Sequence, residues 1–192
     1  MGTMKRREWL KTSLAAAGAA GLSGLPAAAA EGGPKFSKYF GADWELQKAY
    51  TLEVAEAMPA EKYGFKPVAE MRSFGEVLAH IGGSVYFMSA TARGVQPPAE
   101  GRLEGEPTKE KVVAFLTSAF DYAAQAIAAL DDTRAHEVVS VFGGRFTMSR
   151  AKLCEFMRNH TTHHRAYLLP YLRLNAIKPP DYRFTGRGES PV

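Results

Sequence analysis

The sequence of this 192-residue chain predicts an all-α fold: a four-helix bundle with a short β-hairpin between the third and fourth helices. The first observation is that four segments of roughly 20 residues carry apolar side chains at intervals of three and four residues, which is the spacing of one helix face. The second is that strands and helices do not alternate along the chain, as they would in a protein built on a parallel sheet. The length and the hydrophobic content of 46% suit one globular domain with a buried core.

Residues 1–30 have the layout of an export signal. A basic cluster, "MKRREWLK", precedes a mildly apolar Ala/Gly/Leu stretch that ends in small residues around Ala28–Ala30. The Arg6-Arg7 pair resembles a twin-arginine signal, and the competing interpretation is a frayed, alanine-rich helix. We therefore predict cleavage near residue 30, an exported, periplasmic protein, and a mature bundle domain over residues 31–192.

The charge balance and the cysteine content exclude several other classes of protein. Residues 1–30 hold four Lys/Arg and one Glu of the chain's 24 basic and 20 acidic residues, so residues 31–192 carry a net charge near +1. This balance argues against a nucleic-acid partner, which needs a basic stripe. No later run of about 18 apolar residues predicts a transmembrane helix. The single cysteine, Cys154, cannot form an internal disulfide.

The first two predicted helices have clear boundaries. The first covers residues 37–57 and ends at Met58-Pro59, because the residue before a proline avoids helical geometry. Ser73 opens the second helix, and Glu76 follows three residues later in the pattern of a capping box.

The third helix and the hairpin follow in order. Thr108 is the predicted cap of a helix over residues 109–130. Residues 136–147 then break the helical pattern, because β-branched and aromatic residues flank Gly143-Gly144. This arrangement predicts a short hairpin with the two glycines in its turn.

The last helix is predicted to begin after Ser149 and to reach residue 174. Pro170 lies inside it and is expected to kink or strain its last turns. Asn175 is expected to adopt the left-handed conformation that often ends a helix.

Three of the five histidines, His160, His163 and His164, lie in this last helix. On a helical wheel, His160 and His164 are one turn apart near the centre of the apolar stripe, and His163 lies on its flank. Tyr167 falls in the same stripe, whereas Arg165 points toward the surface or an interface.

A pair of buried imidazoles one turn apart requires polar partners. Each neutral ring without a partner costs about 1–3 kcal/mol, and a shared divalent ion would satisfy both rings. The alternative is that other polar groups of the core satisfy them. A catalytic metal site usually needs a third protein ligand, and His80, at the edge of the second helix's apolar stripe, is the candidate. His136 is better explained as a surface histidine.

Three segments resemble the DinB/YfiT family in their order and spacing: "EAMPAEKYGFKP" at 56–67, "SFGEVLAHIGGSV" at 73–85 and "NHTTHHRAYLLPYLRLNAIKPPDY" at 159–182. The resemblance covers nearly all of the predicted mature chain and implies a four-helix bundle of DinB type. It also implies that His80, His160 and His164 form a metal site. Ala166 and Tyr167 stand where the family often has Gly and Gln, a departure that leaves the ligands intact.

The resemblance further implies a divalent transition metal, with zinc or nickel favoured, in a protein that often forms homodimers. Three neutral imidazoles leave such an ion its full charge and an open position, so it can polarise a carbonyl or a thiol. We therefore expect an exported metal-dependent hydrolase or thiol transferase that acts on a small molecule. The alternatives are a non-catalytic metal- or ligand-binding protein of the cell envelope and a bundle whose histidines are purely structural. Glu76 is a candidate acid–base residue, although its capping role is favoured.

Overall fold

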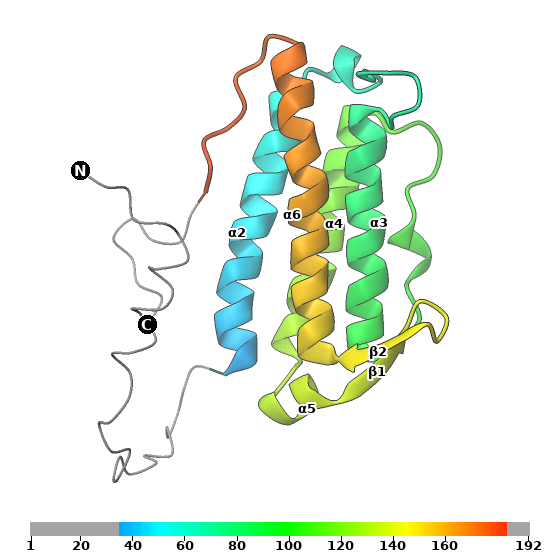
Figure 1. Cartoon of the computed structure of the whole chain (residues 1–192), viewed down its shortest axis with the longest axis vertical. Coiled ribbons are helices and arrows are strands. Elements are labelled where there is room, and N and C mark those ends of the chain that lie inside the picture. Colours follow the sequence, from blue (N-terminus) through cyan, green and yellow to red (C-terminus); the bar gives the residue numbers. More distant parts are fainter. Residues whose placement is uncertain (1–34, 184–192) are drawn as a thin grey trace, which may run out of the picture. The chain divides into compact units, whose positions relative to one another are not determined.

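Four long helices form a bundle in the computed structural model, which describes residues 35–183 (Figure 1). The predicted export signal, residues 1–30, lies outside the described residues. The elements in chain order are α2 (Phe36–Ala57), the 3₁₀ turn η1 (Ala60–Lys62), α3 (Phe74–Arg93), η2 (Ala99–Gly101), α4 (Lys109–Ala128), α5 (Asp132–His136), β1 (Val138–Val141), β2 (Phe146–Ser149) and α6 (Arg150–Leu174). The predicted bundle and hairpin are confirmed. The short helix α5 was not predicted, since five residues are too few to show a helical period.

Side-chain caps fix where the helices begin. The Oγ of Ser73 accepts a hydrogen bond from the backbone N–H of Glu76 at 3.2 Å, and Oε2 of Glu76 accepts one from the backbone N–H of Ser73 at 2.6 Å. This reciprocal pair confirms the capping box. Thr108 and Ser149 cap α4 and α6, each through its side-chain oxygen. Gly94, in the left-handed region with a φ of 80°, ends α3.

The helix α6 ends at the predicted residue, but its C-terminal cap differs from the prediction. The helix continues through Pro170 to Leu174. The predicted left-handed cap at Asn175 is wrong, because Asn175 has a φ of −99° and Ala176 takes the positive φ of 59°. The side-chain amide of Asn175 donates instead to the carbonyl of Tyr171 at 2.9 Å, which satisfies one of the helix's free carbonyls.

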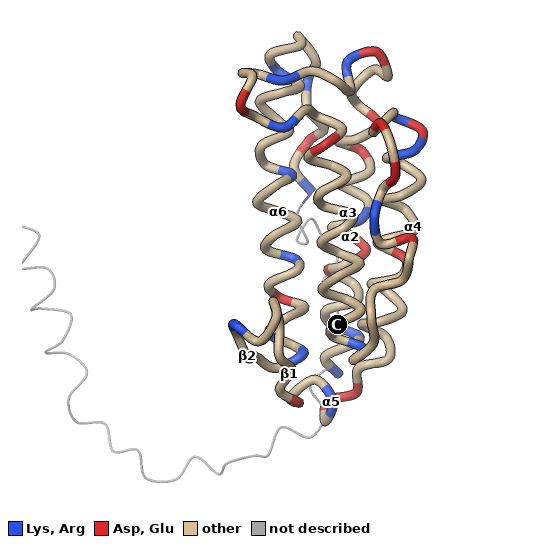
Figure 2. Tube along the Cα trace, turned by 90° about the vertical axis from the view of Figure 1, so that its right-hand side faces the viewer, with Lys and Arg blue, Asp and Glu red and all other residues tan. Residues whose placement is uncertain are grey.

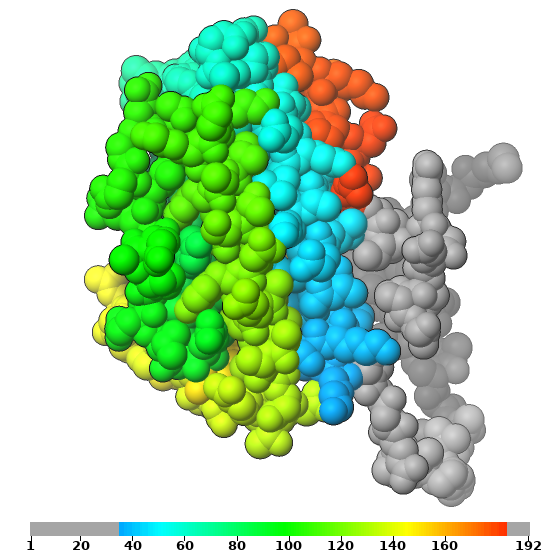
Figure 3. Space-filling view, turned by 180° about the vertical axis from the view of Figure 1, so that it is seen from behind, coloured from blue at the N-terminus to red at the C-terminus, as the bar shows by residue number. Residues whose placement is uncertain are grey.

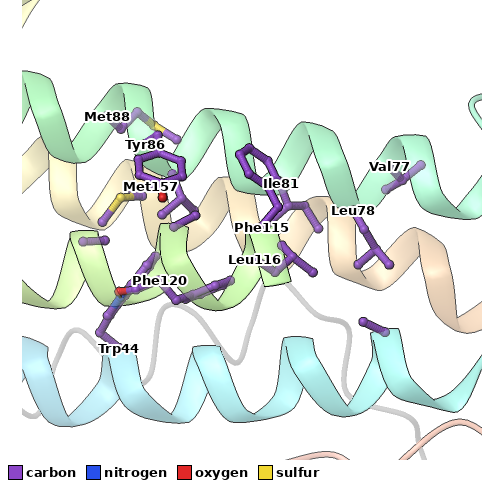
Figure 4. Close-up of a cluster of buried hydrophobic side chains, with 14 of the residues drawn as sticks. Trp44, Val77, Leu78, Ile81, Tyr86, Met88, Phe115, Leu116, Phe120 and Met157 are labelled. Carbon is purple, nitrogen blue, oxygen red and sulfur yellow. The ribbon is translucent and has the colours of Figure 1, made fainter. Parts of the chain in front are cut away.

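The core lies between the four long helices. α3 packs on α4 and α6, and α2 packs on the same two helices from the other side. Figure 3 shows α2 and α4 side by side on the rear face, and Figure 4 shows the buried side chains between α2, α3, α4 and α6. The indole of Trp44 packs on Phe120 with ring centroids 4.9 Å apart, and its Nε1–H donates to the carbonyl of Phe120 at 3.1 Å. The apolar residues that recur at helical spacing along α3 are all buried: Phe74, Val77, Leu78, Ile81, Val85 and Met88.

Two hydrogen bonds join the antiparallel helices α3 and α6 at their ends. Just before α3 begins, the carbonyl of Arg72 accepts a hydrogen bond from the hydroxyl of Tyr171 at 2.9 Å. Near the other end of α3, the carbonyl of Ala92 accepts one from the guanidinium of Arg150. The two contacts fix how the helices are aligned along their length.

The surface carries charges of both signs. Figure 2 shows Lys and Arg interspersed with Asp and Glu, as the near-neutral charge of residues 31–192 predicts. Within residues 35–183, no helix combines the length and the apolar character needed to cross a bilayer.

The contact between α3 and α4 leaves no room for a side chain at Gly82. A methyl group there would lie 2.5 Å from Cε1 of Phe115, whose ring belongs to the core. We expect Gly82→Ala to lower the free energy of unfolding by about 1–3 kcal/mol, although alanine is the better helix former. Urea denaturation measures this change.

The matched control is Gly41→Ala in α2, where nothing lies within 4 Å of the added methyl group. This variant should gain up to about 1 kcal/mol from helix propensity. Equal stabilities for the two variants would contradict the packing described for Gly82.

Candidate metal centre

Three histidines from two helices meet where α3 contacts α6. His80 belongs to α3, and His160 and His164 belong to α6. The ring centroids are 5.1 Å apart for His80 and His160, 4.5 Å for His80 and His164, and 4.4 Å for His160 and His164. Each residue offers one ring nitrogen that lies within 4.8 Å of those of the other two. The fold therefore brings together the three residues that the family resemblance indicates.

The protein itself does not satisfy all the nitrogens of this cluster. Nε2 of His80 lies 3.2 Å from Nε2 of His164, so the two rings can share one proton in a hydrogen bond. Nδ1 of His160 is buried and has no hydrogen-bond partner among the described residues. A buried polar atom without a partner is costly, because it has lost its hydration. A polar or cationic partner bound at the cluster would therefore be favourable.

The geometry of the cluster fits a divalent transition metal. Such an ion binds imidazole nitrogen at about 2.0–2.1 Å, and tetrahedral ligands at that distance stand roughly 3.4 Å from one another. The separation of 3.2 Å between Nε2 of His80 and Nε2 of His164 is close to that value. Small rotations of the rings would bring the third nitrogen to the same spacing, since all three lie within 4.8 Å.

The electrostatic surroundings keep the imidazoles neutral, which is the form that binds metal. Burial, followed by the charges of neighbouring histidines, lowers the pKa of His160 and of His164 to about 4. Burial also lowers the pKa of His80, and the guanidinium of Arg72 contributes to that shift. No carboxylate opposes these effects.

The cluster lies on the flank of the buried face of α6 rather than at its centre. The central positions are held by Met157, Thr161, Arg165 and Leu168, which are buried, while His160 and His164 are half-buried. The prediction that the histidine pair is centred on the core stripe is therefore wrong. The error arose because a hydropathy pattern counts Thr161 and Arg165 as surface residues.

The exposure of Arg165 and that of Tyr167 are both the opposite of what was predicted. Arg165 was expected at the surface but is 4% exposed, and Tyr167 was expected in the stripe but is 47% exposed. The guanidinium of Arg165 is held inside because it donates to Oγ1 of Thr51 at 3.1 Å and lies 4.4 Å from the ring centre of Tyr50. The guanidinium also donates to the carbonyl of Gln47 at 3.3 Å. These two hydrogen bonds and the cation–π contact offset part of the cost of its burial.

Two pockets flank the histidines. A pocket of about 520 Å³ is lined by His80 and His160, together with side chains from α3, the loop after α3, the hairpin and α6. A smaller pocket of about 150 Å³ lies beside His164 and includes Arg72 and Tyr167. The histidine cluster is therefore accessible from solvent, because it lies on the flank of the core and not inside it.

The sequence did not single out the side chains that form the rest of the larger pocket. Phe142 lies in the turn of the hairpin, and Arg102 follows η2, so only the fold brings them beside the histidines. The one signal in the sequence is the aromatic content of the hairpin segment "VVSVFGGRF" at 138–146.

The other candidate residues lie outside this centre. His136 is exposed, as predicted, and His163, which was predicted on the flank of the apolar stripe, is exposed as well. Glu76 serves the capping box, and the backbone N–H of Ser73 lowers its pKa, so it is a poor general acid. Cys154 is buried, and burial raises the pKa of its thiol to about 12, which makes it a poor nucleophile.

Comparison with solved structures finds the same fold. A DinB-like protein from Bacillus subtilis matches with a TM-score of 0.62 and 17% sequence identity, over 75% of this chain and 96% of that one. A DinB-like protein from Bacillus cereus ATCC 10987 matches with a TM-score of 0.61 and 16% identity, over 75% of this chain and 95% of that one. At these identities the similarity concerns the fold alone. No curated protein matches the chain.

The sequence itself carries a family signature over most of the bundle. The profile of the DinB superfamily matches residues 43–168, a range that runs from α2 into α6 and contains all three clustered histidines. This chain therefore belongs to the DinB superfamily.

Proposed function

We propose that His80, His160 and His164 bind one divalent transition metal, zinc or nickel, and that the adjoining pocket holds a small molecule on which the metal acts. The observation that carries the proposal is the meeting of three ring nitrogens within 4.8 Å, one of them from a residue with a buried nitrogen that lacks any partner. The pocket of about 520 Å³ beside His80 and His160 has the size of a small-molecule site.

The reaction we favour is a metal-dependent hydrolysis or a transfer to a thiol. A divalent ion held by three neutral histidines supplies Lewis acidity toward a carbonyl or a thiol. The chain's own residues position the reactants: the rings of Phe142 and Phe156 exclude water from one wall, and the hydroxyl of Ser84 can hydrogen-bond to a bound molecule. Among the described residues that line this pocket there is no Asp, Glu, Lys or Cys. Any proton transfer would therefore depend on the reactants themselves or on water.

The same shortage of acid–base groups favours a second candidate function. A non-catalytic metal- or ligand-binding protein of the cell envelope needs the histidines and the pocket but no general acid or base. Turnover of thiol or ester substrates by the zinc- and nickel-loaded protein distinguishes the two functions.

We also propose that the chain is exported by the twin-arginine route and matures near residue 30. The support is the layout of residues 1–30 and the Arg6-Arg7 pair. Changing both arginines to lysine should trap the precursor in the cytoplasm, whereas the unaltered chain should reach the periplasm with a new N-terminus near residue 31. Cell fractionation and N-terminal sequencing measure both outcomes, and export of the lysine variant would contradict the proposal.

Metal binding depends on each of the three histidines in this proposal. The chain, purified without a histidine tag, should bind about one equivalent of Zn²⁺ or Ni²⁺. Replacement of His80, His160 or His164 by Ala should weaken the affinity by more than about 100-fold, since two ligands hold an ion poorly. Isothermal titration calorimetry and elemental analysis test this.

His163→Ala is the matched control, because this exposed histidine is the immediate neighbour of His164 and has the same side chain. It should bind metal as the unaltered chain does. A chain that binds less than a tenth of an equivalent, or triad variants that bind as well as the control, would contradict the proposed site.

The metal-free protein should lose stability as the pH falls from about 6.5 toward 4. Imidazoles of the unfolded chain accept protons near pH 6.5, whereas those of His160 and His164 in the fold do so only near pH 4. Below pH 6.5 the unfolded state therefore binds more protons, and its free energy falls relative to that of the folded state. The midpoint of urea denaturation should drop between pH 7.5 and pH 4.5.

The control for this titration is His160→Gln, which removes one of the three imidazoles whose pKa the fold lowers. Its midpoint should vary less over the same pH range. A drop as large as that of the unaltered chain would assign the acid sensitivity to carboxylates instead.

A further inference from the structure

We propose that the pocket beside the histidines selects a small molecule that carries a carboxylate and an aromatic ring. Arg102 binds the carboxylate, and the rings of Phe87, Phe142 and Phe156 contact the aromatic ring. This inference rests on the proposed function for the role of the metal, and it names the class of molecule that the same pocket takes.

Arg102 supplies a free positive charge at the pocket. It is the one described lining residue with a permanent charge. Within residues 35–183 it forms no ion pair, and none of its side-chain atoms makes a hydrogen bond to the protein. A guanidinium with all its donors available can bind a carboxylate through two parallel hydrogen bonds.

The surroundings of the histidines reinforce this preference for anions. Among residues 35–183, no Asp or Glu lines the larger pocket or the smaller one beside His164, and Arg72 adds a second guanidinium at the smaller pocket. Positive charges without carboxylates to balance them favour an anion over a neutral or cationic molecule. A divalent ion bound by the histidines would strengthen the same preference.

The aromatic rings define the body of the molecule. Phe142 stacks on Phe87 with centroids 5.6 Å apart and meets Phe156 edge-on at 6.0 Å. Phe156 lies 6.2 Å from His160, so this wall reaches the histidine cluster. A flat apolar molecule that lies against these rings would gain both area burial and favourable ring contacts.

The backbone of the hairpin turn holds Phe142 in an uncommon conformation. Phe142 has a positive φ of 53°, which is unfavourable for a bulky residue. Gly143 and Gly144 follow with φ of 67° and 87°, so the turn as a whole is left-handed. This turn directs the ring of Phe142 onto α3 and the pocket, although the ring stays 38% exposed. Figure 1 shows the hairpin and the loop that carries Arg102 on the same side of α3.

The size of the pocket limits the molecule to a small one. About 520 Å³ accommodates one aromatic ring with a short acid side chain and leaves room near the histidines. Phenylacetate is therefore a suitable probe. Its neutral analogue phenylacetamide lacks the charge, and acetate lacks the ring.

The experiment measures dissociation constants for the three probes by NMR titration of the zinc-loaded full chain. Phenylacetate should bind at least about tenfold more tightly than phenylacetamide, because only the acid pairs with a guanidinium. It should also bind more tightly than acetate. Since Arg102 is exposed, the advantage of the acid over the amide should shrink as the salt concentration rises.

Two variants separate the contributions of charge and ring. Arg102→Gln should weaken the binding of phenylacetate about fivefold or more and leave the binding of phenylacetamide unchanged. Arg102→Lys should restore part of the affinity for phenylacetate. Phe142→Ala should lower the affinity for phenylacetate but not the affinity for acetate. Arg173→Gln, a change to an exposed arginine of α6 that lines neither pocket, is the control and should bind like the unaltered chain.

Equal binding of the acid and the amide, or an Arg102→Gln variant with unchanged affinity for the acid, would overturn the inference. The second result would place the carboxylate on the metal alone. Zinc content, measured on the same samples, separates these outcomes from a failure of the proposed function. A chain with one zinc but no preference for the acid retains the metal site and loses this inference. A chain without zinc that still selects the acid through Arg102 loses the metal site and retains the inference.

Discussion

The alignment of α3 against α6 is the constraint on which the candidate centre depends. One of the three histidines belongs to α3 and two belong to α6, so a slip of one helical turn, about 5.4 Å, would separate nitrogens that now lie within 4.8 Å. The alignment is held from both ends, because Tyr171 donates to the carbonyl of Arg72 and Arg150 donates to that of Ala92. The histidines lie between these two contacts. Neither hydrogen bond involves a histidine of the cluster, yet both hold the helices in the alignment that brings the three rings together.

Crowding explains why the three rings stay neutral. Each imidazole loses hydration to its neighbours, and a proton on one ring would repel a proton on the next. A nearby carboxylate would reverse this effect by stabilising the charged form, but none contributes here. Histidine ligands commonly direct their second nitrogen to a carboxylate or a carbonyl, whereas Nδ1 of His160 has no partner within residues 35–183. The orientation of this ring therefore comes from packing, with Phe156 at 6.2 Å and the other two imidazoles in contact.

The sequence predicted where the helices and strands lie better than it predicted which side of each helix is buried. Caps at Ser73, Thr108 and Ser149 and the glycine turn of the hairpin could be read directly, because their chemistry is local. The face that α6 buries could not be predicted in this way. It depends on residues of α2 that contact the guanidinium of Arg165 inside the bundle. The three histidines were found by spacing together with a family resemblance. Arg102 and Phe142 of the pocket could not be predicted, because they come from a loop and a hairpin turn, which show no period.

This division between helices and loops has a consequence for function. The histidines sit on two long helices whose positions are fixed by the core and by the contacts at their ends. Two of the side chains that would choose the bound molecule, Phe87 and Phe156, belong to the same two helices. The other two, Phe142 and Arg102, sit on short segments, namely the hairpin turn and the residues after η2. Loops tolerate substitution far better than core helices do. Changes at Arg102 or Phe142 can therefore alter which molecule enters the pocket while the histidine cluster keeps its geometry. Part of what would decide which molecule the metal meets therefore lies outside the helices that would hold the metal.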